Sequence, residues 1–137
     1  MQTFLPYKSF EKSAQVLDSK RLGKQRVEAW QILNTLQKRK EGIAKGWANH
    51  PAVLMWDGYE DALREYYNAI VREWIKRGYK NNMIYFLLPS TILYPPWLGD
   101  RKFHNSHRSN LIRKDKEYYS QFWKISGNLP YIWPKGK

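Results

Sequence analysis

A set of acidic, basic and amide residues is spaced to share one face of a helix. The members follow one another at steps of three, four and three residues, the spacing of neighbouring side chains on a helix: Asp18, Arg21, Gln25 and Glu28. A carboxylate kept among cations stays ionised, so it can accept a proton or stabilise a cationic intermediate. The spacing equally allows a structural interpretation, in which Asp18 caps the helix and Glu28 pairs with Lys24. The spacing alone leaves both interpretations open.

A second polar stretch combines cations with small hydrogen-bond donors. Residues 101–114 interleave Arg and Lys with Ser, Asn and His, a combination that suits phosphate oxygens where it begins a helix. His104 and His107 could bind a metal together with Asp100, but the surrounding cations oppose a divalent ion, so we predict no metal site. The sequence also lacks the P-loop, dinucleotide-binding, HExxH and EF-hand patterns.

The overall charge indicates a polyanionic partner. With 24 Lys+Arg against 12 Asp+Glu the formal net charge is +12, which attracts nucleic acid through counterion release. The alternatives are a generically basic protein, an acidic partner or a membrane, and a membrane is disfavoured because one domain needs its apolar stripes for its own core. The absence of cysteine excludes disulfides, thiolate metal sites and thiol nucleophiles. Without a long apolar run or a signal-peptide pattern, the protein is expected to be intracellular and not secreted.

Helical periodicity dominates the sequence and predicts an all-α fold. Each helix begins after a capping residue or at a proline and ends near a glycine or a run of cations. The third helix is expected to be the longest, roughly 40 Å, and its aromatic stripe is expected to form the core. The helices are expected at about residues 10–17, 18–40, 51–76 and from 104–106 to 119, with Ser9 and Asp18 as caps of the first two.

The remaining segments are expected to be irregular. Residues 38–46 indicate an exposed basic loop, and residues 83–88 are equally compatible with a short strand and a buried helical turn. Residues 121–137 form an aromatic, proline-containing tail. At 137 residues we expect one domain, residues 1–137. Its expected form is a compact helical bundle with a long central helix and an irregular aromatic C-terminal tail.

Several of these runs together resemble the pyrimidine-dimer DNA glycosylases typified by phage endonuclease V. The resemblance extends over most of the chain and is closest to cellular members of that family. The runs that carry it are Leu17-Asp18, Arg21-Leu22-Gly23-Lys24-Gln25-Arg26-Val27-Glu28, Asn49-His50-Pro51, Ser106-His107-Arg108-Ser109-Asn110-Leu111 and Tyr131-Ile132-Trp133-Pro134.

The resemblance implies a DNA N-glycosylase with abasic-site lyase activity that acts on damaged double-stranded DNA. In this chemistry the N-terminal α-amine attacks C1′ of the damaged nucleotide, expels the base and holds the sugar as an imine. β-Elimination of the 3′ phosphate then nicks the strand. The resemblance implies no cofactor and no metal. An α-amine suits a chain without cysteine, because α-amines in general titrate about 2.5 pH units below lysine and are less protonated at neutral pH.

Two departures from the family pattern affect the expected catalytic residues. The bulk of Gln2 should hinder removal of the initiator methionine, so Met1 is expected to remain and to supply the amine; a processed Gln2 is the alternative. Where the phage enzyme has an Arg-Glu pair, this chain has Arg21 followed by a leucine. We take Glu28 as the substitute for the missing acid, with Asp18 second.

The other site residues are expected to line the active face or to contact DNA. Arg21 and Gln25 are assigned to the active face. His50 is assigned to the catalytic set, although a role as helix cap explains it equally well. Tyr131 and Trp133 either lie near the lesion or pack into the core. The residues expected to contact DNA are Lys20, Lys24, Arg26, His107, Arg108, Ser109, Asn110, Arg113, Lys114, Tyr131 and Trp133.

Two other functions stay open at this point. The chain could be a non-catalytic basic module that binds nucleic acid, or it could apply the same imine chemistry to another damaged or modified base. Among damaged bases, a pyrimidine dimer is the expected target. The protein is expected to be a monomer with no obligate protein partner and no membrane partner.

Overall fold

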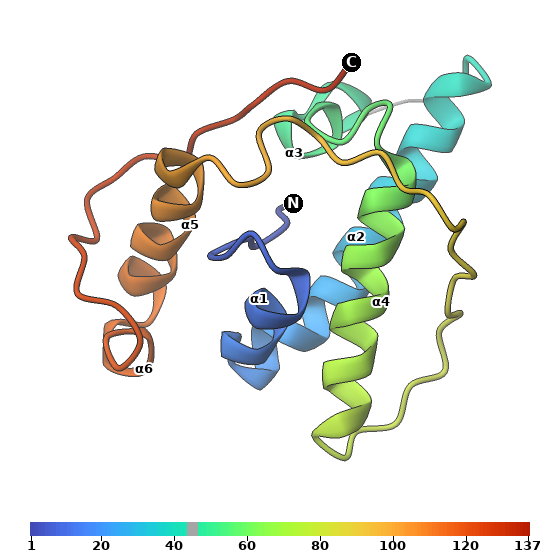
Figure 1. Ribbon diagram of the computed structural model, residues 1–137. Helices are drawn as coiled ribbons and strands as arrows, with labels where there is room; N and C mark the ends of the chain where they lie inside the picture. Colours follow the sequence, from blue (N-terminus) through green and yellow to red (C-terminus); the bar gives the residue numbers. More distant parts are fainter. Residues whose placement is uncertain (44–46) are drawn as a thin grey trace.

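The structure is a computed structural model that describes residues 1–43 and 47–137. Within these ranges it contains α-helices, one short 3-10 helix and no β-strand, which confirms the all-α prediction. None of the described helices is long and apolar enough to cross a membrane. The elements, arranged as Figure 1 shows, are α1 (Phe10–Val16), α2 (Ser19–Lys40), η1 (Trp47–Asn49), α3 (Pro51–Leu54), α4 (Glu60–Lys76), α5 (Arg101–Lys114) and α6 (Lys116–Tyr119).

The first two helices begin at the capping residues expected from the sequence. The side chains of Ser9 and Asp18 each accept a hydrogen bond from the backbone N–H three residues further on. α2 takes up the first three residues of the loop expected at 38–46, and residues 44–46 lie outside the described part of the chain. Gly42, with a φ of 73°, follows the end of α2, in the left-handed conformation that favours glycine after a helix.

The prediction of one long helix over residues 51–76 is wrong, because the chain turns between α3 and α4. α3 ends at Leu54, and α4 begins at Glu60. Between them Gly58 has a φ of 85°, which a right-handed helix cannot contain. Met55 and Trp56 are nevertheless fully buried, so the apolar stripe continues across the turn. Periodicity therefore predicted the burial correctly and missed the break. As a result the longest helix is the 22-residue α2, and α4 has 17 residues.

The last predicted helix is also divided into two. α5 begins at Arg101, where the Asp100 side chain caps it, earlier than the expected start. It ends at Lys114, because Asp115 has a φ of −152° and a ψ of 82°. The Asp115 side chain then caps α6 by accepting a hydrogen bond from the Tyr118 N–H. A capping aspartate thus separates two short helices where periodicity alone predicts one.

Residues 83–88 form neither a strand nor a helical turn. They run extended along the outside of α4, where side chains of that helix hold their backbone. The Tyr67 hydroxyl donates a hydrogen bond to the Ile84 carbonyl at 2.5 Å. The Asn68 side chain bonds both backbone groups of Phe86, at 2.8 Å to the carbonyl and 3.0 Å from the N–H. Side-chain amides and hydroxyls therefore replace the strand partner that this segment lacks.

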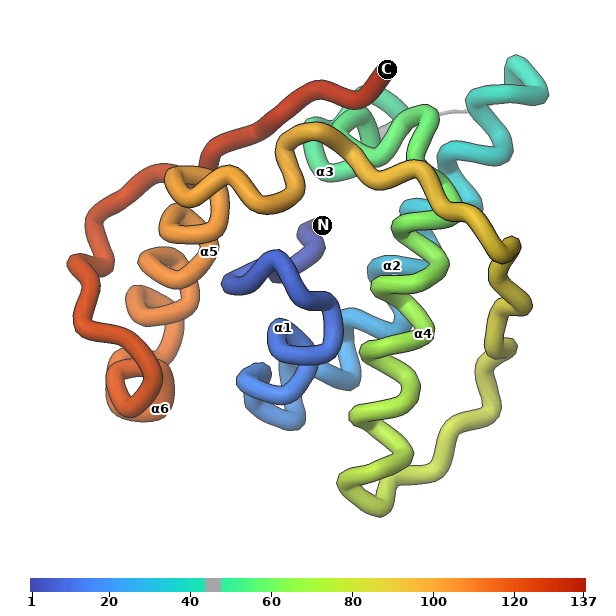
Figure 2. Tube along the Cα trace, in the orientation of Figure 1, coloured from blue at the N-terminus to red at the C-terminus, as the bar shows by residue number. Residues whose placement is uncertain are grey.

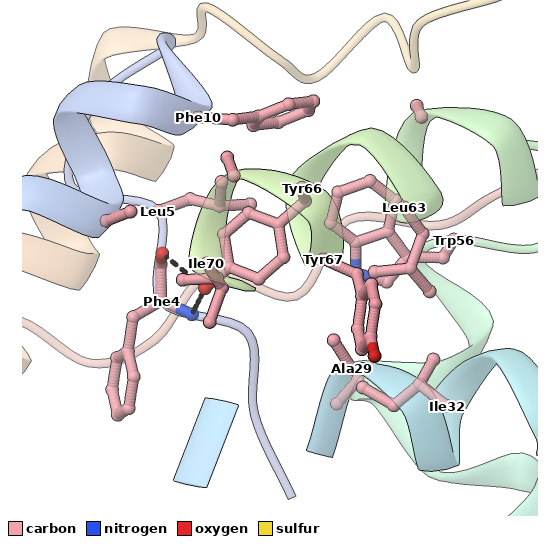
Figure 3. Close-up of a cluster of buried hydrophobic side chains, with 14 of the residues drawn as sticks. Phe4, Leu5, Phe10, Ala29, Ile32, Trp56, Leu63, Tyr66, Tyr67 and Ile70 are labelled. Atoms are coloured by element: carbon pink, nitrogen blue, oxygen red, sulfur yellow. Dashed lines mark hydrogen bonds between the residues drawn. The ribbon is translucent and has the colours of Figure 1, made fainter. Parts of the chain in front are cut away.

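α4 is the centre of the core, because it packs against both α1 and α2. Trp56, Tyr66 and Tyr67 are fully buried, which confirms that the aromatic stripe belongs to the core. Figure 2 shows the first residues of the chain running into the space between α5 and the α2–α4 pair. In Figure 3 the Tyr66 hydroxyl points at the backbone of Phe4 and is joined to it by two hydrogen bonds.

We predict that Gly58→Ala destabilises the protein by about 1–2 kcal/mol, because the new side chain would have to adopt a positive φ. The added Cβ would also lie 2.7 Å from the Lys137 side chain, which is flexible and can move. Urea unfolding measures the change. Gly127→Ala is the matched control, since its Cβ would meet only ordinary contacts at 3.6 Å. Equal losses in the two variants would contradict the prediction.

Candidate active site at the N-terminus

The first residues of the chain are buried and extended, and side chains hold their backbone. Residues 2–6 are all buried. The Phe4 N–H lies 3.2 Å from Gln25 Oε1 and 3.1 Å from the Tyr66 hydroxyl, which donates to the Phe4 carbonyl at 2.9 Å. Arg108 Nε donates to the Pro6 carbonyl at 2.7 Å. The position of Met1 is therefore set by α2, α4 and α5 together.

Two histidines of α5 bind both backbone groups of Leu5. The Leu5 N–H donates to His107 Nδ1 at 3.0 Å, and the Leu5 carbonyl lies 2.8 Å from His104 Nδ1. Because the Gly99 N–H donates to His104 Nε2, His104 carries its proton on Nδ1 and donates to Leu5. Burial lowers the pKa of His104 and lowers the pKa of His107 to about 3. Both rings are neutral, as this arrangement requires.

The Glu28 carboxylate lies beside the peptide bond that joins Met1 to Gln2. Its Oε2 accepts a hydrogen bond from the Gln2 N–H at 3.1 Å and another from Gln25 Nε2 at 3.1 Å. Gln25 Nε2 also donates to the Gln2 carbonyl at 2.9 Å. In the described part of the chain Glu28 forms no ion pair, so the alternative pairing with Lys24 is not found.

Asp18, the second candidate for the catalytic acid, is occupied elsewhere. It caps α2, pairs with Arg21 at 3.0 Å and accepts a hydrogen bond from the Tyr119 hydroxyl. Burial raises the pKa of Asp18, but the hydrogen bonds from Tyr119 and Arg21 outweigh it and the pKa falls below its usual value. The ion pair with Asp18 also fixes the direction of the Arg21 guanidinium, which points toward the Asp18 carboxylate. The geometry therefore favours Glu28 over Asp18 as the acid at the N-terminus.

His50 caps α3 and also lies near the N-terminal amine. Its Nδ1 accepts a hydrogen bond from the Ala52 N–H at 3.0 Å, so the interpretation as a helix cap is confirmed. Burial lowers the pKa of His50, and the charge of the N-terminal amine lowers it further. The imidazole meets Trp133 edge-on, with ring centroids 5.9 Å apart. The cap thus holds the ring against the tail.

The C-terminal tail runs from α6 past α5 to α3, as Figure 1 shows. Its Tyr131 ring lies 5.5 Å from the ring of His107, and the Tyr131 hydroxyl is buried without a hydrogen-bond partner in the described part of the chain. Burial raises the pKa of that hydroxyl; the Gln2 side chain lies beside it, outside hydrogen-bond geometry, and opposes the shift. The Gly136 N–H donates to the Leu54 carbonyl of α3 at 3.0 Å. The tail therefore forms one wall of the site.

Three residues expected to contact DNA are buried instead. His107 holds Leu5, Ser109 binds the backbone of residues 126 and 129, and Asn110 donates to the Leu129 carbonyl at 3.1 Å. At most 1% of each side chain is exposed, because this face of α5 packs on the N-terminal segment and the tail. The expectation of DNA contact is corrected for these three, which position other parts of the site.

The cations expected to contact DNA are more accessible. Lys20, Lys24, Arg113 and Lys114 are exposed. Two others are partly buried and stacked on aromatic rings: Arg26 lies 4.3 Å from the Trp74 ring centroid, and Arg108 lies 4.8 Å from that of Tyr7.

A groove along α2 leads to the acid. Its volume is about 530 Å³, and its lining includes Lys20, Lys24, Arg26, Glu28 and Trp74. A larger cavity of about 790 Å³ lies between α1 and residues 94–98 and contains none of the predicted site residues. The groove on α2 combines cations with a carboxylate, and this chemistry suits a phosphate-bearing strand.

Sequence reasoning missed two residues that position the site. Tyr66 belongs to the apolar stripe of α4, and nothing in its spacing shows that its hydroxyl lies 2.6 Å from Gln25 Oε1. His104 was considered only as a metal ligand, although it binds the backbone of Leu5. Both contacts join residues far apart in the chain, so the sequence carries no local signal for them.

The site thus combines a carboxylate that binds the Gln2 N–H with a basic groove on α2. The model of the pyrimidine dimer DNA glycosylase family matches residues 1–86, which is more than half of the chain. The chain belongs to this family of DNA repair glycosylases, which act on damaged DNA, and the resemblance found in the sequence is confirmed. Comparison with curated proteins and with solved structures gave no match.

We predict that acid destabilises the protein through His107. Its pKa is about 3 in the folded chain and about 6.5 when unfolded. Between these values the unfolded chain takes up a proton that the folded chain does not. Stability is therefore complete above about pH 6.5 and falls by about 2 kcal/mol by about pH 5. Urea unfolding at both pH values measures the loss, which should be smaller in His107→Gln. An equal loss in the variant would refute the assignment.

We predict that Gln25→Ala lowers stability by about 2–4 kcal/mol, because buried groups of Phe4 and Gln2 lose partners. The variant should also lose kcat and keep its affinity for DNA, since Gln25 positions Glu28 and need not touch the strand. Urea unfolding and single-turnover base excision measure the two effects. Gln37→Ala, an exposed change on the same helix, is the control. A variant that loses DNA affinity and keeps kcat would contradict this role.

Proposed function

We propose that this protein is a bifunctional DNA glycosylase and abasic-site lyase whose nucleophile is the α-amine of Met1. The observation that carries the proposal is the hydrogen bond from the Gln2 N–H to Glu28 Oε2 at 3.1 Å. That bond places a carboxylate one residue from the amine. The effect of the amine on the pKa of His50 supports the same location.

The proposed reaction begins with attack of the unprotonated amine on C1′ of the damaged nucleotide. The nitrogen lone pair forms the new N–C1′ bond while the bond between C1′ and the base breaks; its electron pair leaves with the base, which takes up a proton. Opening of the sugar ring protonates O4′ and gives an imine. Loss of a proton from C2′ then expels the 3′ phosphate, and hydrolysis of the imine regenerates the amine.

Each nearby residue has a defined part in this proposal. Glu28 accepts a proton and stabilises the cationic sugar, as a carboxylate within hydrogen-bond reach can. Gln25 is a positioning residue, because it binds Glu28 and the Gln2 carbonyl at once. His50 uses Nδ1 as a helix cap, which leaves Nε2 for proton exchange near the amine. Arg21, which pairs with Asp18, is assigned to the active face.

Binding of double-stranded DNA is assigned to the exposed cations on two elements. Lys20 and Lys24 follow the groove on α2, and Arg113 and Lys114 lie at the end of α5. Such contacts release counterions, so affinity should fall steeply with salt. A lesion that weakens base stacking lowers the energy needed to extrude the nucleotide. The family match makes a pyrimidine dimer the proposed lesion.

Borohydride trapping tests the proposal. A duplex that contains a pyrimidine dimer should yield a covalent complex with the wild-type chain, because borohydride reduces the imine to a stable amine. Glu28→Gln should lower the trapping rate by about 10²–10⁴-fold, and acetylation of the N-terminus should abolish it. Glu41→Gln, which removes a charge at the exposed end of the same helix, should leave the rate unchanged.

Mass analysis of the trapped peptide identifies the residue that carries the sugar, either Met1 or a processed Gln2. Excision without any trapped species would disprove the imine mechanism. Trapping with a different modified base and none with the dimer would reassign the substrate. Salt-dependent binding that survives both Glu28→Gln and acetylation, without base excision, would show a binding module alone.

A further inference from the structure

Trp74, near the end of α4, is stacked between a cation and a second aromatic ring. The guanidinium carbon of Arg26 lies 4.3 Å from the centroid of the Trp74 ring. The Tyr79 ring stacks on the same indole, with centroids 4.2 Å apart and an angle of 22° between the ring planes. Because one face of a ring cannot hold two planar groups at this distance, Arg26 and Tyr79 lie on opposite faces. The indole N–H donates to the Lys80 carbonyl at 2.9 Å, which fixes the orientation of the ring.

Gly23 of α2 allows the Trp74 ring to lie directly against the helix. A Cβ at position 23 would lie 2.9 Å from Trp74 Cζ3 and 3.0 Å from Cη2, closer than Cβ atoms approach other groups without a shift. A glycine inside a helix is less stable than an alanine, so the close approach of Trp74 explains its presence here. The ring is thus held by α2, by Tyr79 and by the bond to Lys80.

The Arg26 guanidinium keeps hydrogen-bond donors that the protein does not use. Its Nη1 donates to Asn81 Oδ1 at 2.8 Å. In the described part of the chain its Nε is buried without a partner, and its Nη2 donates to no other residue. Arg26 also belongs to none of the ion pairs found among the described residues. A guanidinium has five donors, so an oriented cation with unused donors lines the groove on α2.

The acid that lines the same groove does not pair with Arg26. Glu28 instead accepts hydrogen bonds from the Gln2 N–H and from Gln25 Nε2. Lys20 and Lys24 add two further cations to the lining. An anion with two adjacent oxygens fits the fork of a guanidinium, and a phosphodiester is such an anion. The groove therefore suits a phosphate of a nucleic-acid strand at Arg26.

We propose that Trp74 is a positioning residue for DNA binding, which holds Arg26 in the orientation that contacts one phosphate of the strand. This inference rests on the proposed function, since it takes the groove on α2 as a DNA-binding surface. An arginine that moves freely loses rotamer entropy when it binds a phosphate. Stacking on Trp74 and the bond to Asn81 fix the guanidinium before DNA binds, so less entropy is lost on binding. Trp74 itself need not touch the strand.

Binding of undamaged double-stranded DNA to the full chain, measured by fluorescence anisotropy at several salt concentrations, tests the proposal. Trp74→Leu should raise the dissociation constant by about three- to tenfold. It should also reduce the slope of log affinity against log salt by up to about 0.9, the value for one phosphate contact. Trp74→Phe keeps an aromatic face and should retain most of the affinity. Trp30→Leu removes an exposed tryptophan of α2 that lies outside the groove, and it should leave both quantities unchanged.

A double-mutant cycle separates positioning from a merely structural role. Arg26→Gln should weaken binding at least as much as Trp74→Leu, and the double variant should bind no more weakly than Arg26→Gln alone. Gly23→Ala displaces the ring without removing it and should reproduce the loss, which keeps the test decisive if Trp74→Leu does not fold. Circular dichroism verifies folding. Additive effects of Trp74→Leu and Arg26→Gln, or an unchanged salt slope in every folded variant, would overturn the proposal.

These binding measurements do not depend on base excision. A wild-type chain that binds DNA but forms no trapped species would overturn the imine reaction and leave the role of Trp74 intact. A wild-type chain that binds no DNA would overturn both. Where excision is observed, Trp74→Leu should raise KM and keep kcat, because Arg26 is assigned to binding of the strand and not to the chemical step.

Discussion

The structure depends on the hydrogen bonds that hold an extended peptide inside a helical protein. A helix satisfies its own backbone, but residues 2–6 form no helix and pair with no strand. Buried N–H and C=O groups without partners each cost about 1–3 kcal/mol. Side chains from three helices therefore supply the partners: Gln25 from α2, Tyr66 from α4, and His104, His107 and Arg108 from α5.

The same bonds connect the fold to its chemistry. Because Gln25 and Tyr66 hold Phe4, the chain reaches Glu28 in a single position, and the Gln2 N–H can bond to its carboxylate. A nucleophile at a chain end is otherwise among the least ordered groups of a protein. Burial of the residues that follow it would provide the preorganisation that the proposed amine nucleophile needs. This arrangement also requires neutral histidines. A protonated His107 could not accept a hydrogen bond from the Leu5 N–H.

The molecule separates its surfaces by charge. The groove on α2 and the end of α5 carry cations around the proposed site, which suits a substrate whose backbone is a polyanion. Residues 81–99 carry none. Residues 1–86, which match the family, include Gln25, Glu28 and His50. α5 and the tail complete the site from beyond the matched region.

The sequence by itself determined the features that depend on neighbours along the chain. Its periodicity and capping residues identified the helical class, the starts of α1 and α2 and the buried aromatic stripe, because such signals act within a few turns of helix. It also singled out Glu28 and Gln25 through their spacing. The break at Gly58 was missed because the apolar pattern continues through it.

Only the tertiary structure decided which polar residues meet. Asp18 and Glu28 are equivalent in spacing, but Asp18 is bound by Tyr119 from the far end of the chain while Glu28 meets Gln2. From the sequence, Ser109 and Asn110 were expected to contact phosphate. In the structure they form hydrogen bonds with the backbone of the C-terminal tail. Residues 83–88 are compatible in sequence with a short strand or a buried helical turn, and in the structure Leu87 is 96% exposed. In each case the deciding partner is remote in sequence, and local patterns contain no information about contacts that form only when the chain is packed.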